Sequence, residues 1–257
     1  IEGVDYSPEI HVDADNSIYN RLIKLVQYMD NNFPSQNWDQ FYTNDSIHWD
    51  MVMVSGHSQG GGHAGVIAIE KPVDRVLMFA SPNDYSTFYT QVAPWTNMPH
   101  AAADSAYYSF NNIHDGVAPY DWQYTAAVNL GEDNFGDSVN VDINNCPYNG
   151  SHNLYSSMDE GPIGSHGMMI HDNSVPLDGN NDPIFVQEWS YMLGLGCSTA
   201  NISELKDFGF TIYPNPVNDN LTVSLDQSLH GVAYAIYNPL GQMILGGTFS
   251  NASNQIN

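Results

Sequence analysis

Apolar residues recur at helical or strand spacing from about residue 20 to residue 195 of the chain. Segments 20–31 and 184–195 carry apolar residues three and four positions apart, which is typical of amphipathic helices. Short continuous apolar runs lie between them and are typical of strands buried on both faces. The expected strands are 50–55, 73–80, 106–111 and 138–143, and the expected helices between them are 64–70 and 120–130.

This alternation of strands and helices predicts an α/β fold, with a mostly parallel sheet that carries helices on both faces. After Cys197 the pattern changes to short strands in which apolar and polar residues alternate, separated by Pro, Asn and Gly. The sequence therefore predicts an α/β domain at 1–197, a linker at 198–209 and a small all-β domain at 210–257.

Charge excludes two classes of partner. The 257 residues include 29 Asp and Glu but only 5 Lys and Arg, which gives a formal net charge of −24. Such a surface does not neutralise phosphates, so we expect no nucleic acid and no anionic membrane as a partner. No apolar run approaches the roughly 20 residues of a transmembrane helix. The chain begins at Ile1 rather than Met, and we expect the first domain to be N-terminally truncated.

The chain has two cysteines, Cys146 and Cys197. They allow one disulfide, which is favoured only in an oxidising compartment. Two buried free thiols are the alternative, and composition leaves both open.

A candidate nucleophile lies in Gly56-His-Ser-Gln-Gly60, which matches the pattern G-x-S-x-G. The pattern sits between an apolar strand and a helix that begins with glycines, and this arrangement exposes a serine hydroxyl above the edge of a sheet. We expect both glycines to be needed, because the turn is strained and side chains there would collide. Ser58 is the predicted nucleophile; a glycine-rich phosphate loop or an inactive turn is the alternative.

A serine hydroxyl is a weak nucleophile at neutral pH and needs a histidine base, itself oriented by a carboxylate. On such a fold the chain order is serine, acid, histidine. Asp115 directly follows the predicted strand 106–111 and is the expected acid. Asp84, which follows strand 73–80, is its main rival, whereas Asp121 is expected to cap the next helix.

Four histidines follow the last strand predicted in the first domain: His152, His166, His171 and His230. His166 lies among small residues, in Gly164-Ser-His-Gly167, and such a loop can bring an imidazole over Ser58. It is the predicted base, and His152 is the main alternative. His57 and His63 flank the nucleophile, but neighbours in a sharp turn point away from the serine, so we expect them to pack or to line a pocket.

The tetrahedral intermediate of acyl transfer needs two N–H donors. Gln59, the residue after the nucleophile, is expected to supply one from its backbone. The second normally comes from a loop after an earlier strand, which residues 1–11 or a segment upstream of them would supply.

Metal and cofactor signals are weak. Segments 11–15 and 178–182 are rich in Asp and Asn, but neither has the glycine and glutamate spacing of a calcium-binding hand. No set of histidines and cysteines has zinc spacing. We expect no cofactor and no metal.

With Gly56-His-Ser-Gln-Gly60 followed in order by Asp115 and His166, the region 1–197 resembles the α/β-hydrolase superfamily of esterases and lipases. The resemblance implies hydrolysis of a small or polymeric carboxylic ester through an acyl-enzyme. Ser58 would attack, with His166 moving the proton and Gln59 binding the oxyanion. A peptidase or amidase with the same triad, an acyltransferase or haloperoxidase-like activity, and a binding protein with a degenerate pocket are the alternatives.

Residues 210–257 contain Phe210-Thr-Ile-Tyr-Pro-Asn-Pro-Val217 and Ile236-Tyr-Asn-Pro-Leu-Gly-Gln242. These sequences resemble the type A C-terminal sorting domain of the type IX secretion system of Bacteroidota, here expected to end before its last strands. The resemblance implies a β-sandwich that is handled by the secretion machinery and a protein that is extracellular or on the outer cell surface. Export favours a disulfide between Cys146 and Cys197.

Overall fold

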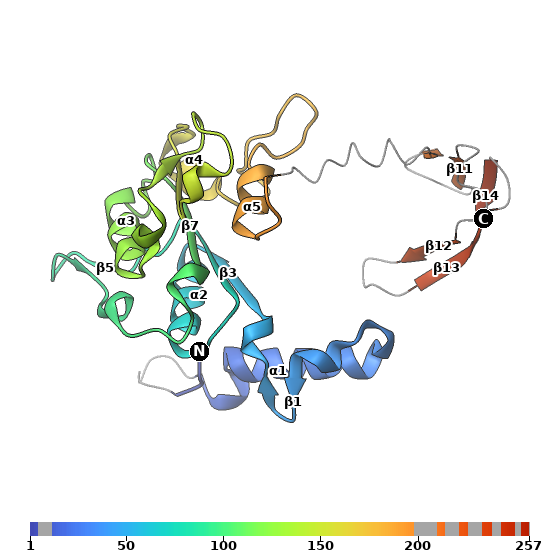
Figure 1. Cartoon of the computed structure of the whole chain (residues 1–257), viewed down its shortest axis with the longest axis horizontal. Helices are drawn as coiled ribbons and strands as arrows, with labels where there is room; N and C mark the ends of the chain where they lie inside the picture. The colour runs from blue at the N-terminus through green and yellow to red at the C-terminus, as the bar shows by residue number, and fades with distance from the viewer. Residues whose placement is uncertain are drawn as a thin grey trace. The chain divides into compact units, whose positions relative to one another are not determined.

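The computed structural model describes two parts of the chain (Figure 1). They form compact units at Ile1–Cys197 and Ser198–Asn257. The residues described are 1–4 and 12–197 in the first unit, and 210–213, 221–225, 233–237, 243–249 and 253–256 in the second. The predicted linker, 198–209, lies outside the described residues.

A five-stranded parallel sheet forms the centre of the first unit, with the strand order β3-β4-β7-β9-β8. Its strands are β3 (Met53–His57), β4 (Arg75–Phe79), β7 (Tyr107–Asn112), β8 (Val139–Asn140) and β9 (Asn153–Ser156). Because all of them run in the same direction, their carboxyl ends meet at one edge of the sheet. This confirms the predicted parallel α/β fold.

The main helices of the first unit are α1 (Ile18–Asn32), α2 (Gln59–Glu70), α3 (Tyr120–Asn129), α4 (Gly161–Gly167) and α5 (Val186–Met192). One face of the sheet packs against α2 in an apolar cluster that includes Ala68 and Val76. The other face packs against α5 and the chain after α4, where Met168 and Met192 are fully buried. Both faces are therefore covered, as the pattern predicts.

Shorter elements connect this framework. The hairpins are β1 (Tyr42–Thr43) with β2 (Ser46–Ile47), and β5 (Tyr85–Ser86) with β6 (Gln91–Val92). The 3-10 helices are η1 (Ala14–Asn16), η2 (Pro34–Gln36), η3 (Trp38–Phe41), η4 (Trp49–Met51), η5 (Pro94–Asn97), η6 (Asp104–Ala106), η7 (Glu132–Phe135) and η8 (Tyr148–Gly150). The β1–β2 hairpin packs on α1 in a separate small cluster around Ile23, Val26 and Ile47.

Two strands differ from the sequence prediction. β3 was expected to be buried on both faces, but it is an edge strand in which Met53 is 47% exposed. The sequence pattern also missed β9, because Asn153-Leu-Tyr-Ser156 has too few apolar residues to stand out. β9 lies between β7 and β8, which places β8 at the edge of the sheet. Of the predicted strand 138–143, only the two residues of β8 form a strand.

The second unit is built from antiparallel strands, as the alternating pattern predicts. They are β10 (Phe210–Tyr213), β11 (Leu221–Leu225), β12 (Ala233–Tyr237), β13 (Met243–Thr248) and β14 (Ser253–Ile256). The strands make a three-stranded sheet, β10-β11-β14, and a two-stranded sheet, β12-β13.

A disulfide joins Cys146 to Cys197, two residues separated by 51 positions, which confirms the predicted pair. The segment that it closes contains β9, α4 and α5. In the chain-entropy account a disulfide stabilises the fold by restricting the unfolded chain, and more so for longer loops.

Replacing both cysteines, as Cys146→Ser with Cys197→Ser, is expected to lower the free energy of unfolding by about 4 kcal/mol. Thermal unfolding with and without a reductant measures the effect. The reductant should lower the Tm of the wild type and leave that of the double variant unchanged. A wild-type Tm that does not respond to complete reduction would contradict a stabilising role.

Glu132 of η7 carries a fully buried carboxyl group. Its Oε2 accepts a hydrogen bond of 2.6 Å from the Ser109 hydroxyl, and among the described residues Oε1 has no partner. Burial raises the pKa of Glu132 from 4.5 to about 8, outweighing the hydrogen bonds from Ser109. The folded protein therefore holds a proton there that the unfolded chain loses near pH 4.5.

Since the folded state binds this extra proton, Glu132 should lower the free energy of unfolding as pH rises from about 4.5 to about 8. The free energy of unfolding should fall by at most about 1.4 kcal/mol per pH unit in this range. Glu132→Gln should remove this slope, and Asp137→Asn, an exposed control, should keep it. Urea unfolding at several pH values tests this, and parallel pH profiles for wild type and Glu132→Gln would refute it.

Candidate active site

Ser58 occupies a sharp turn between the end of β3 and the start of α2. Its φ of 56° and ψ of −124° lie in a region that residues other than glycine rarely adopt. The backbone N–H of Ser58 donates to the carbonyl of Phe79 at 2.8 Å, and its own carbonyl accepts from Gly61 at 3.0 Å. The strand, turn and helix expected from the G-x-S-x-G pattern are thus present, with a serine held in a strained conformation.

Two glycines allow this turn, but they are not the two that the pattern suggests. A Cβ on Gly56 would lie 2.1 Å from the carbonyl of Gly60, so position 56 must be glycine. A Cβ on Gly60 itself would meet nothing within 4 Å, so the expected collision at this position was wrong. The second crowded position is Gly61, where a Cβ would lie 2.4 Å from that of Ser81.

Asp115 and His166 are brought together, although 51 residues separate them in the chain. Asp115 follows β7, and its N–H donates to the carbonyl of Asn112. Its Oδ2 lies 2.7 Å from Nδ1 of His166 on α4. Because a carboxylate only accepts, the imidazole carries its proton on Nδ1 and leaves Nε2 free to act as an acceptor.

The carboxylate of Asp115 is fully buried and well supplied with donors. Oδ1 accepts from the backbone N–H groups of Val117 and Ala118 at 2.8 and 2.9 Å, and Oδ2 accepts from Gln123 Nε2 at 3.0 Å. Burial alone would raise the pKa of Asp115, but the hydrogen bonds and the nearby His166 outweigh it and hold the pKa below its usual value. Asp115 is therefore ionised at neutral pH.

Two contacts fix α4 against the loops around it. His57, the residue before Ser58, donates from Nε2 to the carbonyl of His166 at 2.9 Å, and the two rings lie 4.8 Å apart. Gly116, next to Asp115, donates its N–H to the carbonyl oxygen of Pro162 on α4. A Cβ on Gly116 would lie 2.3 Å from the Cβ of Pro162. Burial lowers the pKa of His57, so its ring is neutral at neutral pH.

The loops that carry these residues follow four adjacent strands. Ser58 follows β3, Asn83 follows β4, Asp115 follows β7, and α4 with His166 follows β9. Among the described residues the one hydrogen-bond partner of Ser58 Oγ is Asn83 Nδ2, at 3.4 Å. The structure thus pairs Asp115 with His166 and links Ser58 to them through its neighbour His57, without a hydrogen bond between Ser58 Oγ and the His166 ring.

Gln59, the predicted oxyanion donor, is the first residue of α2. The first N–H groups of a helix have no acceptor inside the helix. Within the described part of the chain the Gln59 N–H has no hydrogen-bond acceptor, which leaves it available to an anion at Ser58. Of the expected source of the second donor, residues 5–11 lie outside the described segment.

The alternative triad residues are engaged elsewhere. Asp84 Oδ2 accepts a hydrogen bond of 2.8 Å from Trp95 Nε1. His152 donates from Nδ1 to the carbonyl of Tyr107 at 2.9 Å and is stacked on Tyr108 and Phe135. Burial lowers its pKa to about 4, as expected for an imidazole that packs in a core.

Of the remaining histidines, His57 lines a pocket as expected, whereas His63 is exposed. His171 lines a polar recess of about 340 Å³ that His57 shares. His230 lies outside the described residues.

Sequence reasoning missed Asn83 and Gln123. Asn83 lies in Ser81-Pro-Asn-Asp84, directly after a buried strand, and this position at the carboxyl edge of the sheet is a usable signal. Gln123 lies near the start of α3 and belongs to no motif, so only the fold shows that it reaches Asp115.

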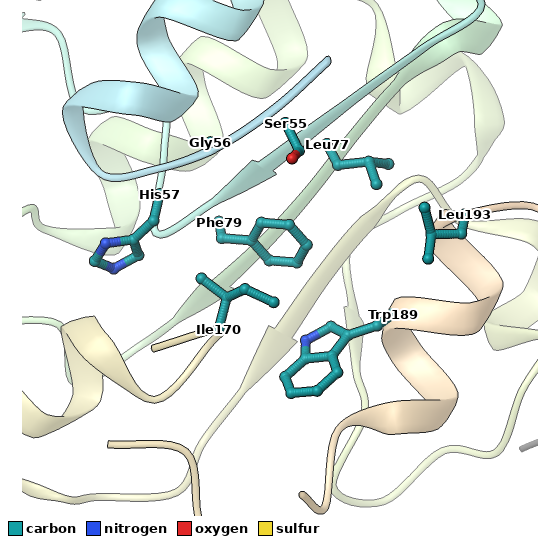
Figure 2. Close-up of a pocket in the computed structure, with 8 residues that line it drawn as sticks. All are labelled: Ser55, Gly56, His57, Leu77, Phe79, Ile170, Trp189 and Leu193. Atoms are coloured by element: carbon teal, nitrogen blue, oxygen red, sulfur yellow. The ribbon is translucent and has the colours of Figure 1, made fainter. Parts of the chain in front are cut away.

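A separate apolar cavity of about 380 Å³ lies beside β3 and β4 on the α5 side of the sheet. Figure 2 shows Phe79 and Ile170 facing into it, with Trp189 and Leu193 of the α5 region on the opposite side. His57 is at its end, but Ser58, Asp115 and His166 do not line it. The cavity therefore adjoins the candidate site without containing it.

The described residues contain no group of three or more His, Cys, Asp or Glu side chains that could hold a metal ion. In the acidic segment 178–182, Asp178 Oδ1 accepts from the N–H groups of Asn180 and Asp182, which makes it a turn. No helix in the described part of the chain is long and apolar enough to cross a membrane.

Comparison with known families identifies the end of the chain. Residues 211–257 match the model of the secretion system C-terminal sorting domain. The protein thus carries a type IX secretion sorting domain and is secreted to the cell surface or the exterior, as the Tyr-Pro-Asn-Pro sequence implies. Searches of curated proteins and of solved structures found no match to the chain.

Replacing Gln123 by Met removes one donor from the buried Asp115 carboxylate while keeping the size of the side chain. This is expected to lower the free energy of unfolding by about 1–3 kcal/mol, because the oxygen loses a partner that water does not replace. Thr125→Ala, an exposed change on the same helix, should cost less than about 0.5 kcal/mol. Urea unfolding of the wild type and the two variants measures these free energies. Equal stabilities of wild type and Gln123→Met would contradict a stabilising hydrogen bond from Gln123 to Asp115.

Proposed function

We propose that this secreted protein is a serine hydrolase that cleaves carboxylic esters through an acyl-enzyme. The observation that carries the proposal is the 2.7 Å hydrogen bond between His166 and the buried Asp115, next to a serine held at positive φ. The likeness of the sequence around Ser58 to that of esterases and lipases supports an ester as the substrate.

In the acylation step Ser58 Oγ bonds to the carbonyl carbon of the ester, and its proton passes to Nε2 of His166. The π electron pair of the carbonyl moves onto its oxygen, where the Gln59 N–H donates to the negative charge. When the carbonyl re-forms, the bond between carbon and the alcohol oxygen breaks. The alcohol leaves with the proton from His166, and the acyl group stays on Ser58.

In the second step a water molecule attacks the acyl carbon and gives a proton to His166. The bond to Ser58 Oγ then breaks, Oγ regains its proton from His166, and the carboxylic acid is released. Asp115 remains ionised throughout, because its donors keep its pKa low. It holds His166 in the tautomer with a free Nε2 and stabilises the imidazolium that forms in each step.

Two hydrogen bonds restrict how the proposed base, His166, can move. His166 is held by Asp115 through its ring and by His57 through its backbone carbonyl. A catalytic hydrogen bond between serine and histidine is often long in the free enzyme and shortens when substrate binds. The proposal therefore does not require a hydrogen bond between Ser58 Oγ and the His166 ring in the free protein.

The wild-type protein should react with a fluorophosphonate probe at Ser58 and hydrolyse p-nitrophenyl butyrate. Ser58→Ala should abolish both, and Asp115→Asn should lower kcat by about 10⁴-fold, because it no longer fixes the histidine tautomer. Peptide mapping locates the label, and initial rates give kcat. Asp84→Asn is the matched control, since it changes the rival carboxyl group in the same way, and it should keep its activity.

The outcomes distinguish a hydrolase from a binding protein, Asp115 from Asp84 as the acid, and an esterase from an amidase. A folded wild type that neither labels nor turns over would overturn the hydrolase proposal and favour a binding role. Loss of activity in Asp84→Asn with Asp115→Asn unaffected would assign the acid to Asp84. Turnover of an anilide in preference to the matching ester would identify an amidase instead of an esterase.

A further inference from the structure

Asn83 lies in the loop that follows β4, the strand next to the one that carries the nucleophile. Its Nδ2 is the one hydrogen-bond partner of Ser58 Oγ among the described residues, at 3.4 Å. The contact places the uncharged NH₂ group of the Asn83 amide, which has two hydrogens to donate, beside Ser58 Oγ, the proposed nucleophile. Neither the triad nor the Gln59 N–H explains why a donor lies there.

The loop holds Asn83 firmly on both sides. Ser81 is fully buried, donates its N–H to Asn111 Oδ1 at 2.9 Å and lies against Gly61 of α2. On the other side, the carbonyl of Asp84 accepts from Ala93 at 2.7 Å, and its carboxylate accepts from Trp95. A donor anchored in this way needs little rearrangement when charge develops beside it.

The chemistry requires such a donor. An oxyanion formed at Ser58 needs two N–H donors, and the backbone N–H of Gln59, at the start of α2, is the expected first one. Side-chain amides of Asn can serve as the second donor in acyl transfer. The neighbouring Asp84 has no N–H group in its side chain, and its Oδ2 already accepts a hydrogen bond from Trp95.

We propose that the side-chain amide of Asn83 is the second oxyanion donor of this protein, an inference that rests on the proposed function. The oxyanion forms on the carbon that bonds to Ser58 Oγ, so it lies within reach of a donor 3.4 Å from Oγ. Oxyanion donors belong about 2.7–3.1 Å from the oxyanion and not from the ground-state atoms. A long contact with Oγ in the free protein fits a group that binds the transition state more strongly than the resting hydroxyl.

The test uses the full chain and three variants. Asn83→Ala removes the donor, and Asn83→Asp replaces it with an acceptor of the same size. Asn97→Ala serves as the matched control, because it makes the same change at an exposed asparagine of η5 that has no part in the proposed site. Circular dichroism and Tm confirm that each variant is folded before kinetics are measured.

Two kinetic readouts are used. The first is kcat and KM for p-nitrophenyl butyrate, and kcat of Asn83→Ala should fall by about 100- to 1,000-fold with little change in KM. The second is the rate ratio between an oxyester and the matching thionoester, whose sulfur accepts hydrogen bonds poorly. This ratio should fall by at least about tenfold in Asn83→Ala, because the oxyester loses a donor that the thionoester scarcely used. Asn83→Asp should be slower still with the oxyester, since its charge repels the oxyanion.

The results separate the inference from the function on which it rests. If Asn83→Ala slows both esters by the same factor, Asn83 only positions the serine hydroxyl, and the proposal is overturned. Unchanged kcat in Asn83→Ala overturns it as well, while wild-type activity that depends on Ser58 leaves the hydrolase assignment intact. If the wild type shows no such activity, the proposed function and this inference both fail.

Discussion

Most of the candidate site depends on the hydrogen bonds that the buried carboxylate of Asp115 accepts. An ionised group removed from water costs several kcal/mol unless hydrogen bonds replace its hydration. Asp115 meets this requirement with donors from its own loop, from Gln123 on α3 and from His166 on α4. The need to satisfy one charge therefore brings α4 to the loop after β7 and to α3, although His166 lies 51 positions beyond Asp115 in the chain.

The parallel sheet makes this convergence possible. Adjacent strands that run in the same direction end at the same edge, so the loops after β3, β4, β7 and β9 become neighbours whatever their distance in sequence. Small residues then let these loops approach closely. Gly56 packs against the backbone of Gly60, Gly61 against Ser81, and Gly116 against Pro162. At each of these positions a methyl group would overlap another part of the site.

Export by the sorting domain bears on the stability of the first unit. The sorting domain sends the protein out of the cell, where a disulfide persists and a high negative charge keeps a protein soluble. The disulfide from Cys146 to Cys197 closes the segment that contains α4, so it restricts the part of the chain that carries His166.

Patterns along the chain predicted the fold class, the turn that holds Ser58 and the sorting domain, and they named Asp115 and His166 as the acid and the base. These features depend on local patterns: apolar periodicity, glycines beside a serine, and the order of strand ends. The disulfide pair was favoured only through the export that the sorting domain implies. The sequence did not show that β3 is an edge strand, that β9 exists, or that Gly61 rather than Gly60 is the crowded glycine. That Asn83 lies at Ser58 Oγ and Gln123 at Asp115 became visible in the folded chain alone, because hydrogen-bond partners across loops are set by how strands pair and not by spacing along the chain.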